Sequence, residues 1–426
     1  MAGSPDRLSH MSAPCKPVQI ISLSSTIYPH LLVKPLKRIT ICVLALLLLC
    51  TSALAEEQQR INLGKAGCYD DLRYAFTLPD GRLVFSGTQA NPGNYHKAHA
   101  RLLILNPDLT VNADYLDPTI GECRYAKPVM LPDGRIGSVM SNNPYQNFGG
   151  IELQFFTQEG MPTGKPIPLD YTEAMLEAVT PSCVFIYVTP EDGSSRRVFL
   201  DWNGKVLFRL AYEDYMGSVP TMIETVDGLV FLGCSPDYPA NAKIMKMDFS
   251  GNPVWENTLP GLLDNGSAEI DLPRATSDGG FLGLIRDRSL DAWTGSGTWA
   301  YALVKFDSEG QVEWMSREIS EKLTDMSTSG LFEYQGEYFL MAKDRNKLSS
   351  PQRILFRFDL EGKLLSQTEI MFDQVNENYA CWPVPTKSGL WFLIDSVTDN
   401  DDIYKEMDTR DMWLVKVADN IIGSGI

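Results

Sequence analysis

Short runs in which apolar and polar residues alternate follow one another along most of the chain. In Met245–Met247, Val304–Phe306 and Phe356–Phe358 the two outer residues are apolar and the central one is Lys or Arg. A period of two residues is typical of a β-strand with one buried face. The pattern therefore predicts an all-β chain of short strands.

Two kinds of turn recur between these runs. The first is an Asp-Gly or related pair, found at Asp80-Gly81, Asp133-Gly134, Asp227-Gly228, Asp278-Gly279, Gln335-Gly336 and Ser388-Gly389. An Asp-Gly pair between apolar runs indicates a β-hairpin. The second reads Asp-x-x-Gly, at Asp201–Gly204, Asp248–Gly251, Asp307–Gly310 and Asp359–Gly362. There the Asp carboxylate can accept backbone N–H groups, and Gly supplies the positive φ that closes the turn.

The two turns alternate and, with looser versions, define seven copies of one unit of four strands. Three successive copies place an aromatic residue four positions after the glycine, at Phe208, Trp255 and Trp314. A four-stranded unit with two apolar faces cannot bury both alone. We therefore predict a seven-bladed β-propeller of antiparallel blades, with six or eight blades as alternatives. The segment Arg60–Leu63 is expected to complete the last blade, because the final copy ends soon after its turn.

DGGFLGLI followed by YALVKFDSEGQVEW, and VDGLVFLG followed by AKIMKMDFSGNPVW, carry a resemblance to known proteins. These copies resemble the repeats of secreted bacterial β-propellers in the broad quinoprotein-like and WD40-like superfamily. The resemblance covers the positions that build blades, so it implies the fold and leaves the specific family and the function open.

Residues 1–55 have the character of an N-terminal extension with a signal peptide. Lys34, Lys37 and Arg38 precede an apolar run, and Ala53-Leu54-Ala55 supplies small residues for cleavage. This predicts a secreted or cell-envelope protein whose residues 56–426 form a single propeller domain. No membrane span is expected after cleavage, although a retained N-terminal anchor is an alternative. The true translation start stays open.

Charge and composition exclude several classes of function. With 37 Lys and Arg against 54 Asp and Glu, the net charge of −17 excludes a surface that binds nucleic acid through its phosphates, and favours a soluble monomer. The five cysteines after residue 55 are widely spaced and lack a CxxC pair, so neither a disulfide framework nor a zinc site is indicated. Buried free thiols are expected for most of them.

No cofactor or metal is implied by the sequence. His96 and His99 are the only histidines after the leader, too few for a three-histidine metal site and a poor basis for Ser/His/Asp hydrolysis. The acidic run at 399–411 is dense enough to attract calcium but lacks the spacing of a calcium-binding loop.

A binding surface is expected on the face where the connections between second and third strands and between successive blades are long. We call this the loop face; the opposite face has tight turns. The candidate ligand-binding residues are Arg124, Tyr125, Arg274, Trp382, Trp293, Trp299 and Tyr145. Aromatic side chains suit contacts with protein or carbohydrate, and arginines can surround a carboxylate or sulfate. The arginines can equally pair with Asp70, Glu122 and Asp271, which lie near them in the sequence.

Two functions remain from different classes. The first is a non-catalytic binding module for a protein, peptide or glycan at the cell surface. The alternative is an enzyme with its active site at the mouth of the ring, a lyase or hydrolase that uses carboxylates, which leave no linear signature. A quinone-dependent dehydrogenase is disfavoured, because the chain has no adjacent cysteines and keeps the repeated tryptophan in only two copies.

Overall fold

Twenty-eight strands make up nearly all the regular structure of the described residues. The structure is a computed structural model that describes residues 59–91, 94, 97–121, 123–142, 149–188, 196–211, 221–237, 239–264, 266–289, 298–347, 352–372, 381–397 and 410–417. The strands are β1 (Arg60–Asn62), β2 (Tyr69–Thr77), β3 (Leu83–Ala90), β4 (His99–Leu105), β5 (Val111–Leu116), β6 (Cys123–Tyr125), β7 (Val129–Met130), β8 (Ile136–Asn142), β9 (Gly149–Phe156), β10 (Ile167–Val179), β11 (Val184–Val188), β12 (Arg196–Leu200), β13 (Val206–Ala211), β14 (Thr221–Thr225), β15 (Gly228–Cys234), β16 (Ala242–Met247), β17 (Pro253–Leu259), β18 (Gly266–Ala275), β19 (Phe281–Ser289), β20 (Trp299–Phe306), β21 (Val312–Ser316), β22 (Met326–Tyr334), β23 (Glu337–Asp344), β24 (Gln352–Phe358), β25 (Leu364–Met371), β26 (Cys381–Thr386), β27 (Gly389–Val397) and β28 (Arg410–Lys416). A helix α2 (Ser320–Leu323) and a 3-10 turn η3 (Arg345–Lys347) lie between strands, and no helix of the described residues has the length and hydrophobicity of a membrane span.

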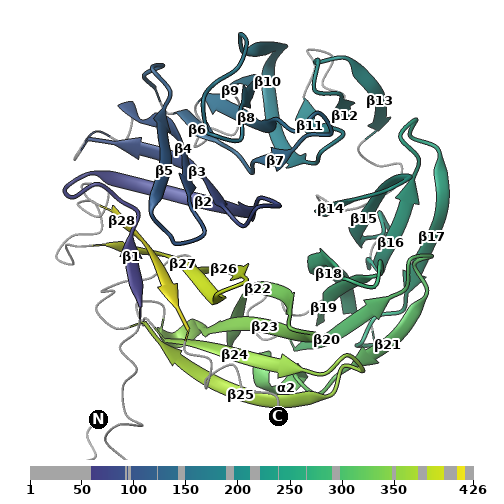
Figure 1. Cartoon of the computed structure of the whole chain (residues 1–426). Helices are drawn as coiled ribbons and strands as arrows, with labels where there is room; N and C mark the ends of the chain where they lie inside the picture. Colours follow the sequence, from purple (N-terminus) through teal and green to yellow (C-terminus); the bar gives the residue numbers. More distant parts are fainter. Residues whose placement is uncertain are drawn as a thin grey trace, which may run out of the picture. The chain divides into compact units, whose positions relative to one another are not determined.

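Consecutive strands pair antiparallel and form the blades of a β-propeller, as predicted. The sets β14–β17, β18–β21 and β22–β25 are each a four-stranded sheet, and the sheets follow one another around a ring (Figure 1). Two larger sheets each run through two of the predicted units. In one of them β10 pairs first with β9 and then with β11, after a register shift between Leu169 and Ala174. The pairings agree with seven units, and the blade number itself stays a prediction.

The N-terminal segment completes the last blade, which confirms the expectation for Arg60–Leu63. Strand β1 pairs antiparallel with β28, with Arg60 opposite Val415 and Asn62 opposite Trp413. The amide of Leu63 extends the pairing by donating to the Met412 carbonyl at 2.7 Å. The first described strand therefore supplies the outer edge of the blade that ends the chain.

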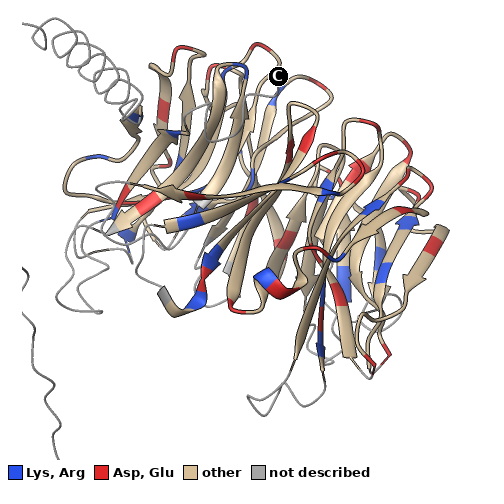
Figure 2. Ribbon diagram, turned by 90° about the horizontal axis from the view of Figure 1, so that it is seen from below, with Lys and Arg blue, Asp and Glu red and all other residues tan. Residues whose placement is uncertain are grey.

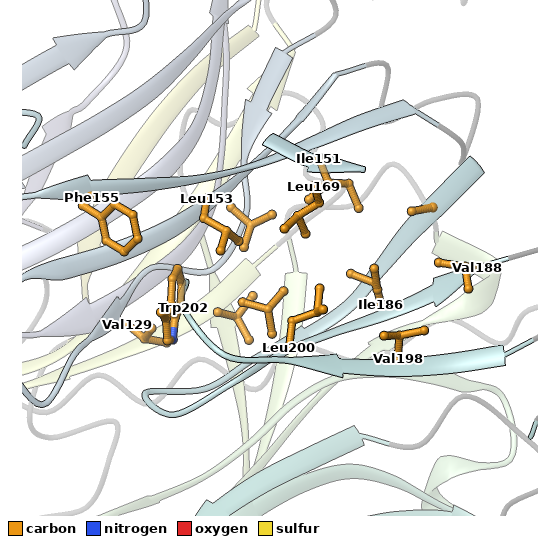
Figure 3. Close-up of a cluster of buried hydrophobic side chains, with 14 of the residues drawn as sticks. Val129, Ile151, Leu153, Phe155, Leu169, Ile186, Val188, Val198, Leu200 and Trp202 are labelled. Carbon is orange, nitrogen blue, oxygen red and sulfur yellow. The ribbon is translucent and has the colours of Figure 1, made fainter. Parts of the chain in front are cut away.

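The hydrophobic core lies between neighbouring sheets. Figure 3 shows one such interface, where Phe155 and Leu153 of β9 face Trp202 and Leu200 of the next unit. The Trp202 ring meets Phe155 edge to face at 5.9 Å between centroids, and its indole N–H donates to the Thr180 carbonyl at 3.0 Å. The tryptophan thus buries its ring and satisfies its only donor.

The repeated aromatic residues make one contact three times. Phe208, Trp255 and Trp314 lie against the glycines of the following Asp-x-x-Gly turns, where φ is +84° at Gly251, +75° at Gly310 and +79° at Gly362. A Cβ on Gly362 would lie 2.5 Å from the Trp314 ring, whose N–H donates to the Leu360 carbonyl at 2.8 Å. Each ring therefore docks onto the turn of the next blade, and glycine is required there by both φ and space.

The alternating strands have the predicted faces. Met245 and Met247 of β16 are fully buried, whereas the Lys246 ammonium between them reaches the Asp227 carboxylate at 2.6 Å. Lys305 and Asp278 make the equivalent pair at 2.9 Å in the next blade. Both acids belong to the Asp-Gly turns, so the basic residue of the third strand fixes the first turn of its own blade.

The four cysteines whose side chains the structure describes are buried thiols, as expected for most of them. These are Cys68, Cys123, Cys183 and Cys234. Burial raises the thiol pKa to about 11 at Cys123 and to about 12 at Cys183, so both thiols stay protonated and inert near neutral pH.

Candidate functional site

The first strand of each blade lies nearest the centre of the ring, as β2, β7, β14, β18, β22 and β26 do in Figure 1. Several of these inner strands are irregular. Register shifts occur at Leu72/Tyr74 in β2, Leu176/Ala178 in β10, Asp271/Arg274 in β18 and Thr328/Gly330 in β22. A bulge inserts an extra residue and redirects side chains. Three charged residues stand at or beside these register shifts, Arg73, Glu177 and Arg274, and Lys127 lies in the gap between β6 and β7.

A buried carboxylate gathers three arginines near the start of the first strands. Asp71 has a side chain that is 1% exposed, and Arg124 approaches its Oδ2 at 2.8 Å. Arg73 donates to both oxygens at 3.0 Å, and Arg410 lies at 3.4 Å from Oδ1. Burial alone would raise the pKa of Asp71, but the three guanidinium groups together lower it below its usual range. We call these four residues the Asp71 cluster.

The Asp71 cluster resolves one alternative that the sequence left open. Arg124 pairs with a carboxylate, as one alternative expected, and this carboxylate belongs to Asp71, which was not among the expected partners. Asp70 instead receives hydrogen bonds from Gln89 and Arg101, both at 2.7 Å. Glu122 lies outside the described residues. Of the cluster, Arg73 is the most accessible, with 37% of its side chain exposed.

Lys127 stands where the first strand of its blade is interrupted, between β6 and β7. The Ala126 carbonyl accepts two serine hydroxyls, from Ser86 at 2.7 Å and from Ser138 at 3.0 Å, and both serines are fully buried. The Ala126 amide donates to the Val139 carbonyl at 2.8 Å. The backbone next to Lys127 is thus fixed, while its side chain is exposed to solvent.

Arg274 follows a strained segment of β18. Leu272 has a φ of +52°, a conformation that residues with a Cβ seldom adopt, and its amide donates to the Asp271 carboxylate at 2.9 Å. The Arg274 side chain is exposed, yet burial lowers its pKa. Both observations hold for a side chain that reaches water while protein surrounds it on several sides. Arg274 lies at the end of β18, beside the turn at Thr276.

Lys127 and Arg274 belong to blades that are not neighbours in the ring (Figure 1). Burial lowers the pKa of Lys127, and the charge of Arg274 lowers it further. Among the described residues, no carboxylate lies within ion-pair distance of either cation.

The remaining predicted ligand-binding residues have different outcomes. Tyr125 is fully buried and donates to the Asp117 carboxylate at 2.8 Å, so its assignment to a binding surface was wrong. Its ring points into the core, and the hydroxyl needs that buried acceptor. Trp382 is half-buried and packs into the core of the last blade. Tyr145 and Trp293 lie outside the described residues.

Trp299 is held between two arginines on the loop face. The guanidinium carbons of Arg286 and Arg345 lie 5.9 Å and 5.6 Å from its ring centroid, and Arg345 belongs to the next blade. Tyr301 stacks on it at 6.4 Å. Trp299 thus contributes to the contact between blades and stays half-exposed.

Glu177 is a buried acid on the bulge of β10. Its side chain is 1% exposed, its nearest charged neighbour is Arg197 at 3.7 Å, and neither of its oxygens accepts a hydrogen bond. Burial raises its pKa to about 7, against the weaker opposing effect of Arg197. A carboxyl group of this kind can exchange a proton near neutral pH but does not reach a ligand at the surface.

Metal binding has little support in the described part of the chain. His99 Nδ1 lies 2.7 Å from the Asp117 carbonyl, while His96 and the acidic run at 399–409 lie outside it. The described residues contain no group of three or more metal-binding side chains.

Sequence reasoning missed Asp71, Arg410 and Glu177. The pattern Asp71-Leu72-Arg73 places the acid and a base two residues apart, on one face of a strand, and was a usable signal. Arg410 reaches the same carboxylate from the other end of the chain, and no local sequence pattern indicates that contact. Glu177 could be identified as an unusual acid only once the bulge in β10 was known.

No family model and no curated protein matches the sequence. Solved structures do match. A catalytically inactive virginiamycin B lyase from Staphylococcus aureus, solved with quinupristin, has a TM-score of 0.50 and 13% identity, covering 85% of this chain and 99% of that one. The β-propeller domain of the Trilobed protease from Pyrococcus furiosus gives 0.45 and 12% over 82% and 95% of the two chains. An α-L-arabinanase from Penicillium chrysogenum gives 0.46 and 11% over 84% and 97%. At such identities the likeness concerns the fold, and together with the ring of antiparallel sheets it shows that the chain is a β-propeller protein.

Proposed function

We propose that this protein is an exported, monomeric binding module that takes a protein, peptide or glycan on its loop face and performs no chemistry on it. The observation that carries the proposal is the Asp71 cluster. Three arginines keep the Asp71 carboxylate ionised. The carboxylate therefore holds their guanidinium groups in place and does not transfer protons. Arg73 and the half-exposed Trp299 present fixed polar and aromatic surface, which is the material of recognition sites.

The distribution of charge supports a selective surface. Acidic residues occupy many of the turns at the edges of the blades, with Lys and Arg interspersed along the strands (Figure 2). Against a net charge of −17, a cluster with three arginines around one carboxylate is a local positive region. Such a region favours ligands with acidic groups, which the rest of the acidic surface repels.

The test is binding of the purified protein from residue 56 onward to glycan and peptide arrays. Arg73→Gln removes the most exposed member of the cluster, and Arg135→Gln is the matched control, because it is also an ion-paired arginine, with 43% of its side chain exposed, but lies on a tight turn. We expect a ligand whose signal falls in Arg73→Gln and persists in Arg135→Gln. No ligand on any array, or equal loss in both variants, contradicts the proposal.

The alternative function is an enzyme that uses carboxylates. The lyase and the arabinanase show that similar folds carry chemistry, but a shared fold does not transfer an activity. If arrays reveal a glycan that the protein also cleaves, the enzyme interpretation replaces the binding module.

A further inference from the structure

An aromatic ring and a cation lie together where two adjacent blades meet on the loop face (Figure 1). Trp299 is the first residue of β20, and Arg345 follows β23 of the next blade, so both border connections between second and third strands. The guanidinium carbon of Arg345 lies 5.6 Å from the centroid of the Trp299 ring. We call these two residues and Tyr301, which stacks on Trp299, the Trp299 platform.

Neighbouring contacts hold the Trp299 platform in a fixed arrangement. The Tyr301 ring is 15° from parallel with that of Trp299, and the Tyr301 amide donates to the Ser320 hydroxyl at 3.0 Å. The Arg345 guanidinium approaches the Tyr301 hydroxyl at 3.5 Å, and the Arg345 amide donates to the Asp325 carbonyl at 2.9 Å. A ligand therefore meets side chains that are already ordered, which reduces the entropy lost on binding.

One polar group of the Trp299 platform has no partner in the described part of the chain. The indole N–H of Trp299 donates to none of the described residues, although the ring is half-exposed. Three other tryptophans do donate their indole N–H to described residues: Trp202, Trp314 and Trp413. The polar edge of Trp299 is thus available to an acceptor on a ligand.

The charge of Arg345 is also uncompensated. Its side chain is exposed, and no carboxylate of the described residues forms an ion pair with it. Arg286, the other arginine beside the Trp299 ring, is different, because Glu269 and Asp271 pair with it at 2.5 Å and 3.6 Å. The platform therefore offers one net positive charge to a ligand, next to an aromatic surface.

We infer that the Trp299 platform binds a uronic acid, a sugar that carries a carboxylate, as a subsite of the proposed binding module, on which this inference rests. Polarised C–H groups of a sugar ring pack against the exposed part of the indole, and a sugar oxygen accepts its N–H. The planar carboxylate accepts two parallel hydrogen bonds from Arg345, and its single charge matches the single uncompensated cation. An acidic peptide side chain uses the arginine alone, so the indole beside it favours the sugar.

Binding is tested by isothermal titration calorimetry with oligosaccharides of galacturonate, glucuronate and mannuronate, and with their methyl esters, which keep the ring and lose the charge. The variants are Arg345→Gln and Trp299→Phe. Arg135→Gln is the matched control, because Arg135 is also exposed and lies 4.5 Å from the centroid of an aromatic ring, that of Phe155, but on a tight turn. We expect at least one acid to bind with a millimolar or lower dissociation constant, weakened about tenfold or more by Arg345→Gln and unchanged in the control.

The preference for acid over methyl ester separates recognition from a loss of structure, because a misfolded variant loses both ligands. Arg345→Gln should lose this preference and keep its affinity for the ester, whereas Trp299→Phe should weaken acid and ester alike. The inference is overturned if no uronate binds, if tetraglutamate binds more tightly than every uronate, or if the acid binds Arg345→Gln as well as the unmodified chain. In each of these cases an array ligand that Arg73→Gln loses would leave the proposed function standing, and the absence of any array ligand would end both.

Discussion

Replacing Gly310 by alanine tests whether the aromatic residues dock the blades to one another. Gly310 has a φ of +75°, and a Cβ there would overlap the Trp255 ring of the preceding blade. The left-handed backbone costs a residue with a Cβ about 1–2 kcal/mol. Forcing the ring aside adds about 1–3 kcal/mol, the usual penalty for overpacking. The free energy of unfolding is therefore expected to fall by roughly 2–5 kcal/mol.

Gly336→Ala is the matched control, because Gly336 has a φ of +76° and a Cβ there would meet nothing within 4 Å. It should lose only the backbone contribution. The two variants should then differ by about 3 kcal/mol at most, or close to 4 °C in melting temperature for a domain of this size, taking roughly 2.1 cal/mol/K per residue for the unfolding entropy.

The assay is thermal and urea unfolding followed by circular dichroism and tryptophan fluorescence. Trp255→Ala combined with Gly310→Ala completes a double-mutant cycle, in which the alanine at 310 should cost less once the ring is gone. Equal losses in Gly310→Ala and Gly336→Ala, or strict additivity in the cycle, would refute the docking contact as a determinant of stability.

Three further predictions follow from charges and from ring closure. Asp71→Asn leaves three arginines around a neutral amide and should lower the free energy of unfolding by about 3–5 kcal/mol, measured by urea titration; a loss below 1 kcal/mol would contradict the cluster. Glu177 has a folded pKa of about 7 against 4.5 as its usual value, so its contribution to stability is lost as pH rises through that window; Glu177→Gln should match the unmodified chain at pH 4, below the window, and exceed it at pH 8, and parallel pH profiles would count against this. Starting the chain after Leu63 removes β1 and should lower the melting temperature sharply, whereas an unchanged transition would show that β1 is dispensable.

The fold was largely predictable because the determinants of a blade are local. Turn glycines and alternating apolar residues occur within a few positions of each other, whereas the docking of Trp255 and Trp314 onto the turns of the next blades became visible only in the structure. The candidate site was only partly predictable. Arg274 was a candidate, yet its place along β18 depends on a bulge that no spacing rule indicates. Contacts such as Arg410 with Asp71 join the two ends of the chain and become visible only when the ring is built.

The pairing of β1 with β28 also sets the order in which the protein can mature. Ile61 lies opposite Leu414, so the strand that leaves the ribosome first must wait for one made about 350 residues later. Until then the first blade and the last each lack a neighbour, and the edges of both sheets are open to pairing with other chains. The pairing of β1 with β28 is therefore the step at which aggregation competes with assembly. Conditions that delay the synthesis of β28 should lower the yield of folded protein far more than they lower the stability of the finished ring.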